Sequence, residues 1–181
     1  MNFRLAKIED IPGIIKVSVD TWRTAYQDIF PADYLNNLSY EKGEEKWRKR
    51  FIDPERHIFF YIAETDVKEI VGFVLGDFEQ SDLTLKIPGI RKYIGELRAI
   101  YVLKEYQRRG IGVNLVKMVV ERLLENNINS MIVWVLEDNP NRKFYEILRG
   151  RYIGQKMLEK EGVDYVAFAY GWDDIRQILS Y

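Results

Sequence analysis

The chain has no cysteine and a single histidine among its 181 residues. Without cysteine it can form no disulfide framework, no thiolate nucleophile and no thiolate metal site. The one histidine, His57, cannot build a metal site that needs several histidines. It could serve a Ser-His-Asp triad only as the base. The composition therefore excludes most cysteine and zinc chemistry, and we expect no bound metal.

Long apolar runs and an excess of one charge are also missing. The 27 basic and 28 acidic side chains leave a net charge of −1, so neither nucleic acid nor a membrane is an expected partner. Charges interrupt residues 1–22 every few positions, which is untypical of a signal peptide or a membrane span. We expect a soluble cytoplasmic protein in which residues 1–181 form a single domain, because a chain of this length buries a sizeable core.

The first part of the chain is predicted to be mainly helical. A short strand near residues 4–5 precedes a helix that Asp10 is expected to cap, with proline in its first turn. A second helical region is expected over residues 32–51, with breaks near Ser39 and Gly43.

The rest of the chain alternates strands and helices. Apolar and alternating runs predict strands at residues 57–64, 69–78, 96–103, 131–136, 152–158 and 163–170. Hairpins are expected to turn around Asp66 and at Glu161-Gly162. A helix between the third and fourth of these strands has one apolar stripe, formed by Val116, Val119, Val120 and Leu123. This strand-helix-strand unit predicts a crossover with parallel strands. The fold class is α+β or mixed α/β with one central sheet.

The stretch EYQRRGIGVNL (Glu105–Leu115) places two arginines and two glycines directly before that helix. Helix N-termini carry free N–H groups and partial positive charge, and Gly110 and Gly112 let an anion approach the backbone closely. Arg108 and Arg109 can neutralise a pyrophosphate. A Walker loop would need Gly-Lys-Ser/Thr, and a dinucleotide site a third glycine. The alternative is a glycine-relaxed helix start with two solvated arginines.

Two motifs together resemble a known family. The stretch Gln107–Gly112, after the strand LRAIYV, resembles the central motif of the GNAT superfamily of N-acetyltransferases. The segment EDNPNRKFYEIL (residues 137–148), after MIVWVL, is similar to that family's following motif, and the order of elements agrees over essentially the whole chain. The resemblance implies a mostly antiparallel sheet with one splayed parallel strand pair and helices on both faces.

The resemblance also implies acetyl-coenzyme A as co-substrate, with no metal. The backbone of one strand would hydrogen-bond the pantetheine arm, and N–H groups of the turn would hold the pyrophosphate. On this basis the cofactor-binding residues are Ile100, Tyr101, Val102, Gln107, Arg108, Arg109, Gly110, Ile111, Gly112, Val113 and Asn139. In this family an amine attacks the thioester directly, and a chain without cysteine fits a reaction without a covalent enzyme intermediate.

Glu96 is the predicted general base. An alkylammonium with a pKa near 10 must lose a proton before it attacks, and a carboxylate in the cleft can take that proton directly or through water. Glu96 lies eleven residues before Gln107, where the resembling family often carries its base. The alternative is a glutamate at the exposed start of a strand, where it pairs with Arg98 or with a neighbouring strand.

Tyr145 is the predicted general acid, because a phenol can pass a proton to a thiolate within hydrogen-bonding distance. In the resembling family a tyrosine at this place lies beside the sulfur. The alternative is that Phe144 and Tyr145 only pack the helix onto the sheet. Asn139 is expected to cap a helix over residues 140–148, and the resemblance adds a contact with pantetheine. Its spacing from Tyr145 is shorter than the family's commoner spacing.

The acceptor side is less defined. Trp22, Tyr26 and Tyr34, together with the segment 78–93, are predicted to face the acceptor, and the alternative for these aromatic residues is plain core packing. The function predicted is transfer of an acetyl group from acetyl-coenzyme A to a primary amine of a small molecule or a peptide. The rivals are a catalytically idle acyl-coenzyme A-binding module and a protein-interaction domain. A homodimer that pairs through the C-terminal strands is compatible with the sequence.

Overall fold

The computed structural model of the protein describes residues 1–52, 57–79 and 93–181. The strands are β1 (Asn2–Leu5), β2 (Ile58–Glu64), β3 (Ile70–Asp77), β4 (Gly95–Val102), β5 (Met131–Leu136), β6 (Arg151–Lys160) and β7 (Val163–Trp172). The α-helices are α1 (Ile11–Ala25), α2 (Ala32–Asn36), α3 (Tyr40–Phe51), α4 (Ile111–Glu125) and α5 (Lys143–Ile147). Short 3-10 helices are η1 (Ile8–Asp10), η4 (Lys104–Tyr106) and η5 (Ile175–Ser180).

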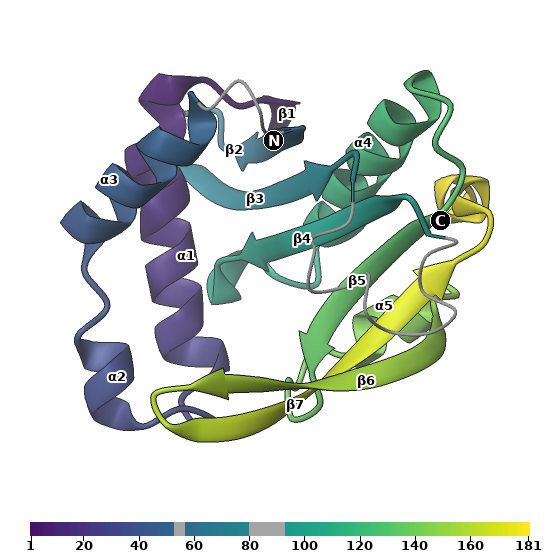
Figure 1. The fold of residues 1–181 in the computed structure, drawn as a ribbon. Helices are drawn as coiled ribbons and strands as arrows, with labels where there is room; N and C mark the ends of the chain where they lie inside the picture. Colours follow the sequence, from purple (N-terminus) through teal and green to yellow (C-terminus); the bar gives the residue numbers. More distant parts are fainter. Residues whose placement is uncertain (53–56, 80–92) are drawn as a thin grey trace. The chain divides into compact units, whose positions relative to one another are not determined.

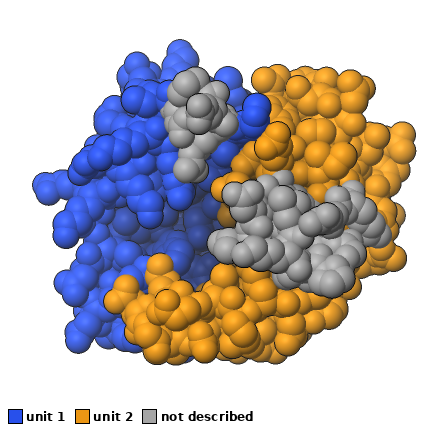
Figure 2. Space-filling model, in the orientation of Figure 1, with its two compact units in different colours: residues 1–76, 99–119 blue, residues 77–98, 120–181 orange. Residues whose placement is uncertain are grey.

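The strands form one seven-stranded sheet in the order β1-β2-β3-β4-β5-β7-β6 (Figure 1). It is mostly antiparallel with one parallel pair and is flanked by helices, so the predicted fold class is confirmed. The chain divides into two compact units, coloured separately in Figure 2. Unit 1 contains residues 1–76 and 99–119, and unit 2 contains residues 77–98 and 120–181.

Unit 1 is built on β1, β2, β3 and the second half of β4. β1 pairs with β2 in antiparallel fashion, from Asn2 opposite Glu64 to Leu5 opposite Tyr61. The predicted hairpin of β2 and β3 is confirmed: the N–H of Thr65 donates to the carbonyl of Glu69 over 2.8 Å and closes the turn.

Helices cover both faces of the sheet in unit 1. On one face the Trp47 ring of α3 packs on Phe60 and Phe73, with ring centroids 5.4 Å apart in each case. On the other face a Cβ added to Gly72 would lie 3.4 Å from the side chain of Leu115 on α4. Gly72 and Phe73 are neighbours on β3 and point to opposite faces, so α3 and α4 lie on different sides.

The first helix starts where predicted, but its cap differs. Asp10 stands at the N-cap position of α1, with proline in the first turn, yet its side chain makes no capping hydrogen bond there. Instead the Asp10 carboxylate accepts from both terminal nitrogens of Arg4, over 2.7 and 2.8 Å, and from the N–H of Lys7. Asp10 is thus the N-cap residue, as predicted, but its carboxylate does not cap the helix because a guanidinium and the preceding turn occupy it.

The second helical region breaks once, not twice. Ser39 is the N-cap of α3 and its hydroxyl accepts from the N–H of Lys42, so the predicted break at Ser39 is confirmed. Gly43 lies inside α3, and the predicted break there is wrong. A Cβ at Gly43 would approach a methyl carbon of Ile15 on α1 to 2.9 Å. The glycine therefore allows a close helix contact and does not end a helix.

Unit 2 contains the parallel pair and the C-terminal strands. Residues 95–97 of β4 pair with residues 131–133 of β5 in parallel, which confirms the predicted crossover through α4. β5 pairs with β7 and β7 with β6, both in antiparallel fashion, and the register shifts between Tyr152 and Gly154. The predicted hairpin at Glu161-Gly162 is confirmed, and both residues adopt positive φ angles.

The helices of unit 2 are shorter than the sequence suggests. α5 begins at Lys143, not at Pro140 as predicted, because residues 139–142 form a separate turn. The end of the chain forms η5, whose Ile175 and Ile178 are buried and whose N-cap, Asp174, accepts from the N–H of Arg176. No helix in the described part of the chain is both long and apolar enough to span a membrane.

Candidate active site

The turn before α4 presents a run of backbone N–H groups. Arg108 and Gly110 adopt positive φ angles of 61° and 78°, which bend the chain sharply into the helix. Within the described residues, none of the N–H groups from Arg108 to Val113 has a hydrogen-bond acceptor. The next N–H, that of Asn114, donates to the carbonyl of Gly110 over 3.1 Å and begins the helical pattern. Consecutive N–H groups of this kind at a helix N-terminus bind anions.

The side chains of the turn hold it in place and leave its charge exposed. The Gln107 amide donates to the carbonyl of Val102 over 2.9 Å and ties the turn to the end of β4. Arg109 donates to the carbonyl of Glu105 over 2.8 Å and lies above the Tyr106 ring. Arg108 is exposed. The turn therefore combines unpaired N–H groups with two guanidinium groups at the surface.

The end of β4 is joined to α1 through Tyr101. Its hydroxyl accepts a hydrogen bond from the Trp22 indole over 2.9 Å, and its ring packs on Phe73 with centroids 5.5 Å apart. Burial raises the pKa of the Tyr101 phenol, and hydrogen bonds from Trp22 and Tyr26 act in the opposite direction. Tyr101 is therefore a neutral anchor for this strand at physiological pH.

The three predicted acceptor-side aromatic residues lie together in unit 1. Trp22 packs on Tyr26 at 4.8 Å between ring centroids and on Tyr34 at 6.4 Å. Phe30, which the sequence did not single out, completes the cluster and stacks on Trp22 at 5.4 Å. The four-residue spacing of Tyr26, Phe30 and Tyr34 is the signal that could have revealed it. The segment 78–93, also predicted for the acceptor side, lies outside the described residues at positions 80–92.

In unit 2, Glu96 is a buried carboxylate on β4, with 6% of the residue exposed. Arg98, one partner that the alternative reading gave to Glu96, forms an ion pair with Asp77 at 2.7 Å. Burial lowers the pKa of Lys156 on β6, and the negative charge of Glu96 has the opposite, smaller effect on that pKa. Glu96 is therefore buried and does not lie at a solvated strand end.

Tyr145 is 9% exposed and stacks on Tyr170 of β7, with ring centroids 6.0 Å apart. The Tyr170 hydroxyl donates to Glu146 over 2.7 Å and accepts from Arg142 over 3.0 Å. Burial, and then the hydrogen bond to Glu146, raise the pKa of Tyr170. Tyr145 therefore rests on a second tyrosine that an arginine and a glutamate hold in place.

Glu96 and Tyr145 lie on opposite faces of the strands of unit 2. Glu96 pairs with Ile132, and Ile132 pairs with Gly171, so all three point to one face. Tyr170 precedes Gly171 and points to the other face. Because Tyr145 stacks on Tyr170, it lies on that other face too. The arrangement suits chemistry in which one proton leaves from one side and another is supplied from the opposite side.

Asn139 does not cap α5, in contrast to the prediction. Arg142 is the N-cap of that helix. The Asn139 side-chain oxygen accepts from the N–H of Asn141 over 2.8 Å, and its carbonyl accepts from the N–H of Arg142. Asn139 therefore organises the turn between β5 and α5, because an asparagine side chain closes a local turn as readily as it caps a helix.

Within positions 1–52, 57–79 and 93–181, no group of three or more histidine, cysteine, aspartate or glutamate side chains could hold a metal ion.

Comparison with known proteins identifies the family of this chain. Residues 19–159 match the model of the acetyltransferase (GNAT) family. The chain belongs to the GNAT family. The uncharacterized N-acetyltransferase YuaI of Bacillus subtilis is 37% identical over 180 residues, which cover 99% of this chain and 97% of that protein. The protein is accordingly an acyltransferase that depends on acetyl-coenzyme A.

Solved structures share the fold of this GNAT protein. The PaiA N-acetyltransferase of Thermoplasma acidophilum, in complex with coenzyme A, has a TM-score of 0.64 at 21% identity. That match covers 93% of this chain and 98% of the other. The yncA protein of Salmonella typhimurium, solved with acetyl-coenzyme A, has a TM-score of 0.64 at 12% identity, covering 97% and 94% of the two chains.

The predicted site residues of this GNAT protein fall into two groups. Unit 1 brings together the turn Gln107–Val113, the end of β4 at residues 100–102 and the aromatic cluster around Trp22. Unit 2 carries Glu96, Asn139 and Tyr145. The residues that sequence reasoning missed are Phe30, Trp134, Lys156 and Tyr170. Only Phe30 has a signal in the sequence, its spacing from Tyr26 and Tyr34; the signals of the other three lie in strand register and ring contacts, which the sequence does not display.

Proposed function

We propose that this GNAT protein is an N-acetyltransferase that moves an acetyl group from acetyl-coenzyme A to a primary amine by direct attack. The observation that carries the proposal is the run of unpaired N–H groups from Arg108 to Val113 at the start of α4. These groups and the guanidinium of Arg108 would hold the pyrophosphate of the cofactor. The backbone of residues 100–102 would hydrogen-bond its pantetheine arm, as a neighbouring strand would.

Glu96 is proposed to act on the amine. It accepts a proton from the acceptor ammonium, directly or through water, and so frees the nitrogen lone pair. The nitrogen then attacks the thioester carbonyl carbon, a carbon–nitrogen bond forms, and the nitrogen, now positively charged, loses its second proton to solvent. A backbone N–H of β4 near Tyr101 or Val102 stabilises the oxyanion that develops.

Tyr145 is proposed to act on the leaving group. As the carbon–sulfur bond breaks, the Tyr145 hydroxyl gives its proton to the thiolate, and the products are the acetylated amine and free coenzyme A. The stack on Tyr170 supports this role because it fixes the ring of Tyr145. The opposite faces of the base and the acid support the same order of events, with the amine arriving on one side and sulfur leaving on the other.

The test is release of free thiol from acetyl-coenzyme A over a panel of primary amines. Because the chain has no cysteine, a thiol reagent reports only coenzyme A. We expect amine-dependent release, together with a rise in melting temperature on adding acetyl-coenzyme A. A rise in melting temperature without release by any amine would favour the idle binding module. Absence of both would favour the interaction domain.

The remaining expectations accompany this proposal. Residues 1–181 are proposed to work as a single domain that contains both groups of site residues. The acceptor is proposed to be a small molecule or a peptide. The cytoplasmic location and the homodimer stay predictions.

A further inference from the structure

Lys156 is a half-buried cation that forms no ion pair with the described residues, although the charge of Glu96 lies near enough to act on it. Its ammonium lies 4.0 Å from the centre of the Trp134 ring, and the structure gives it neither an ion pair nor a hydrogen-bond acceptor among those residues. Burial lowers the pKa of Lys156, and the charge of Glu96 opposes that effect. The indole offsets part of the cost of burial but cannot replace an anion. A cation in this state is suited to receive an anionic ligand.

Strand register places Lys156 on the same face as Glu96. Lys156 pairs with Ala167, and Ala167 pairs with Leu136. Leu136 and Ile132 both point to this face because they are four residues apart on β5. Ile132 pairs with Glu96. The cation and the proposed base therefore line one side of the sheet of unit 2.

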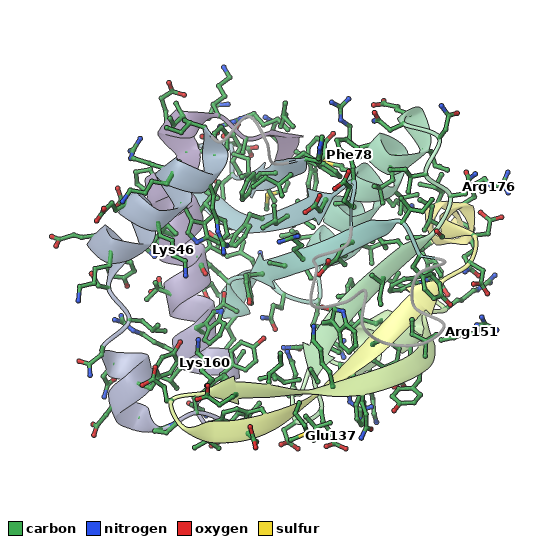
Figure 3. All side chains as sticks on the ribbon, in the orientation of Figure 1. Lys46, Phe78, Glu137, Arg151, Lys160 and Arg176 are labelled. Atoms are coloured by element: carbon green, nitrogen blue, oxygen red, sulfur yellow. The ribbon has the colours of Figure 1, made fainter. Side chains whose placement is uncertain are left out.

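The charges of the β6–β7 hairpin are sorted between its two faces. Lys156 and Lys160 point to the face of Glu96, and Lys160 is labelled at the hairpin end of β6 in Figure 3. Glu159 and its partner Asp164 point to the other face. Arg98, two residues from Glu96 on β4, shares this face, and its ion pair with the Asp77 carboxylate at 2.7 Å offsets the charge of Asp77. Such a surface favours an acceptor with a negative group and repels a polycation.

We propose that Lys156 binds the carboxylate of the acceptor, so that the acceptor is a primary amine carrying a carboxylate, with a free amino acid as the simplest example. The inference rests on the proposed function, because it assigns the amine of the same molecule to Glu96. The Trp134 ring lies against the Lys156 ammonium and gives the acceptor an apolar surface beside the charge.

The test compares acceptors with and without the α-carboxylate, at a pH where the amines of both are largely protonated. Leucine, phenylalanine and glutamate are each assayed beside their α-carboxamide, with spermidine as a polycation, by release of coenzyme A. The variants are Lys156→Met, which keeps the length and removes the charge, and Lys156→Arg, which keeps a charge. Lys143→Met on α5 is the matched control, because Lys143 is exposed.

We expect the acids to have higher kcat/KM than their amides. Lys156→Met should lower kcat/KM for the acids by about ten- to a hundredfold, mainly through KM, because it removes a charge-assisted hydrogen bond. The same variant should change kcat/KM for the amides less than about threefold, because the amides make no charge-assisted hydrogen bond to Lys156 that could be lost. Lys156→Arg should restore most of the activity toward the acids, and Lys143→Met should have no effect.

Results that contradict the carboxylate site differ from results that contradict the proposed function. Equal use of acids and amides, an equal loss for both in Lys156→Met, or a preference for spermidine overturns the carboxylate site and leaves the proposed function standing. No release of coenzyme A by any amine overturns the proposed function and this site with it. The melting temperatures of the variants are measured as well. If they are unchanged, an equal loss of activity does not come from unfolded protein.

Discussion

The two units hold their candidate site residues in different ways. In unit 1 the proposed anion site is one continuous stretch, Gln107–Val113, whose geometry follows from two positive φ angles and a helix start. In unit 2 the proposed chemistry draws on Glu96, Lys156 and Tyr145 from β4, β6 and α5. A local site tolerates changes elsewhere, whereas a dispersed one depends on the register of every strand between its members. Substitutions should therefore separate cofactor binding in unit 1 from catalysis in unit 2.

The largest effect is expected for Glu96→Gln in unit 2. Loss of a general base should lower kcat/KM by about a hundred- to a thousandfold at neutral pH, with the affinity for coenzyme A retained. The residual activity should also lose the dependence on Glu96 ionisation at the acidic end of the profile. Initial rates across pH measure this. Glu121→Gln on α4 is the control, because Glu121 is exposed, and an equal loss in it would contradict the assignment.

Tyr145→Phe should have a somewhat smaller effect in the same unit. The ring and its stack on Tyr170 remain, but the proton for the thiolate must come from water, so kcat should fall by about ten- to a hundredfold. Calorimetric titration with coenzyme A should give an unchanged affinity. Tyr152→Phe on β6 is the control. It removes the hydroxyl of an exposed tyrosine that has no proposed role in the reaction, and it should act like the unaltered protein. Turnover that survives Tyr145→Phe would reduce Tyr145 to packing.

Gly110→Ala tests unit 1 against a matched glycine in unit 2. Gly110 and Gly162 have nearly equal φ angles, 78° and 73°, and neither has a neighbour closer than 3.8 Å to an added Cβ. Each alanine should cost about 1 kcal/mol of stability because an L-residue is strained at such φ angles. Only Gly110→Ala should weaken binding of coenzyme A, by about tenfold, because the N–H groups beside it shift. Equal affinities in the two variants would contradict the anion site.

The smallest effect concerns stability and tests whether the two units unfold together. The Glu64 carboxylate in unit 1 is 1% exposed and binds Arg4, Lys68 and Asn2 over 2.9 Å each. Hydrogen bonds from Arg4, Lys68 and Asn2 lower the pKa of Glu64 to about 2. Because the folded pKa lies below the ordinary value of 4.5, its stabilisation is present above pH 4.5 and is lost as the pH falls toward 2.

Glu64→Gln should therefore lower the free energy of unfolding by about 1 kcal/mol at pH 7, because its cationic partners are partly solvated. The difference from the unaltered protein should shrink on acidification toward pH 2. Urea unfolding followed by circular dichroism measures both. If residues 1–181 form one domain, the variant shifts a single transition. Two separate transitions, with only one shifted, would contradict the single-domain prediction.

The accuracy of sequence-based prediction followed the range of the interactions. The stripe of α4 and the strands around it were predicted because periodicity and the turn are local signals. Asp10 is the predicted N-cap residue, but its carboxylate binds Arg4, and the cap at Asn139 was wrong because its amide closes a tight turn. The break at Gly43 was wrong because contact with Ile15 of another helix outweighs a glycine's low helix propensity.

The candidate site shows the same limit. Glu96 was found through its distance from Gln107 along the chain, whereas Lys156 is sixty residues further on and meets Glu96 only through the register of three strand pairs. The ring of Tyr170 beneath Tyr145 was likewise invisible, because an aromatic residue in an apolar strand has no distinctive pattern. Residues 80–92, predicted for the acceptor side, lie outside the described part of the chain.

The separation of Glu96 and Tyr145 by the thickness of a sheet has a kinetic consequence. With the roles proposed for them, Glu96 takes a proton from nitrogen, whereas the proton delivered to sulfur comes from Tyr145. Each group must regain its resting protonation by its own route to bulk water before another cycle begins. Both substrates must also be present at once, so initial-rate lines at several fixed cofactor concentrations should intersect and not run parallel.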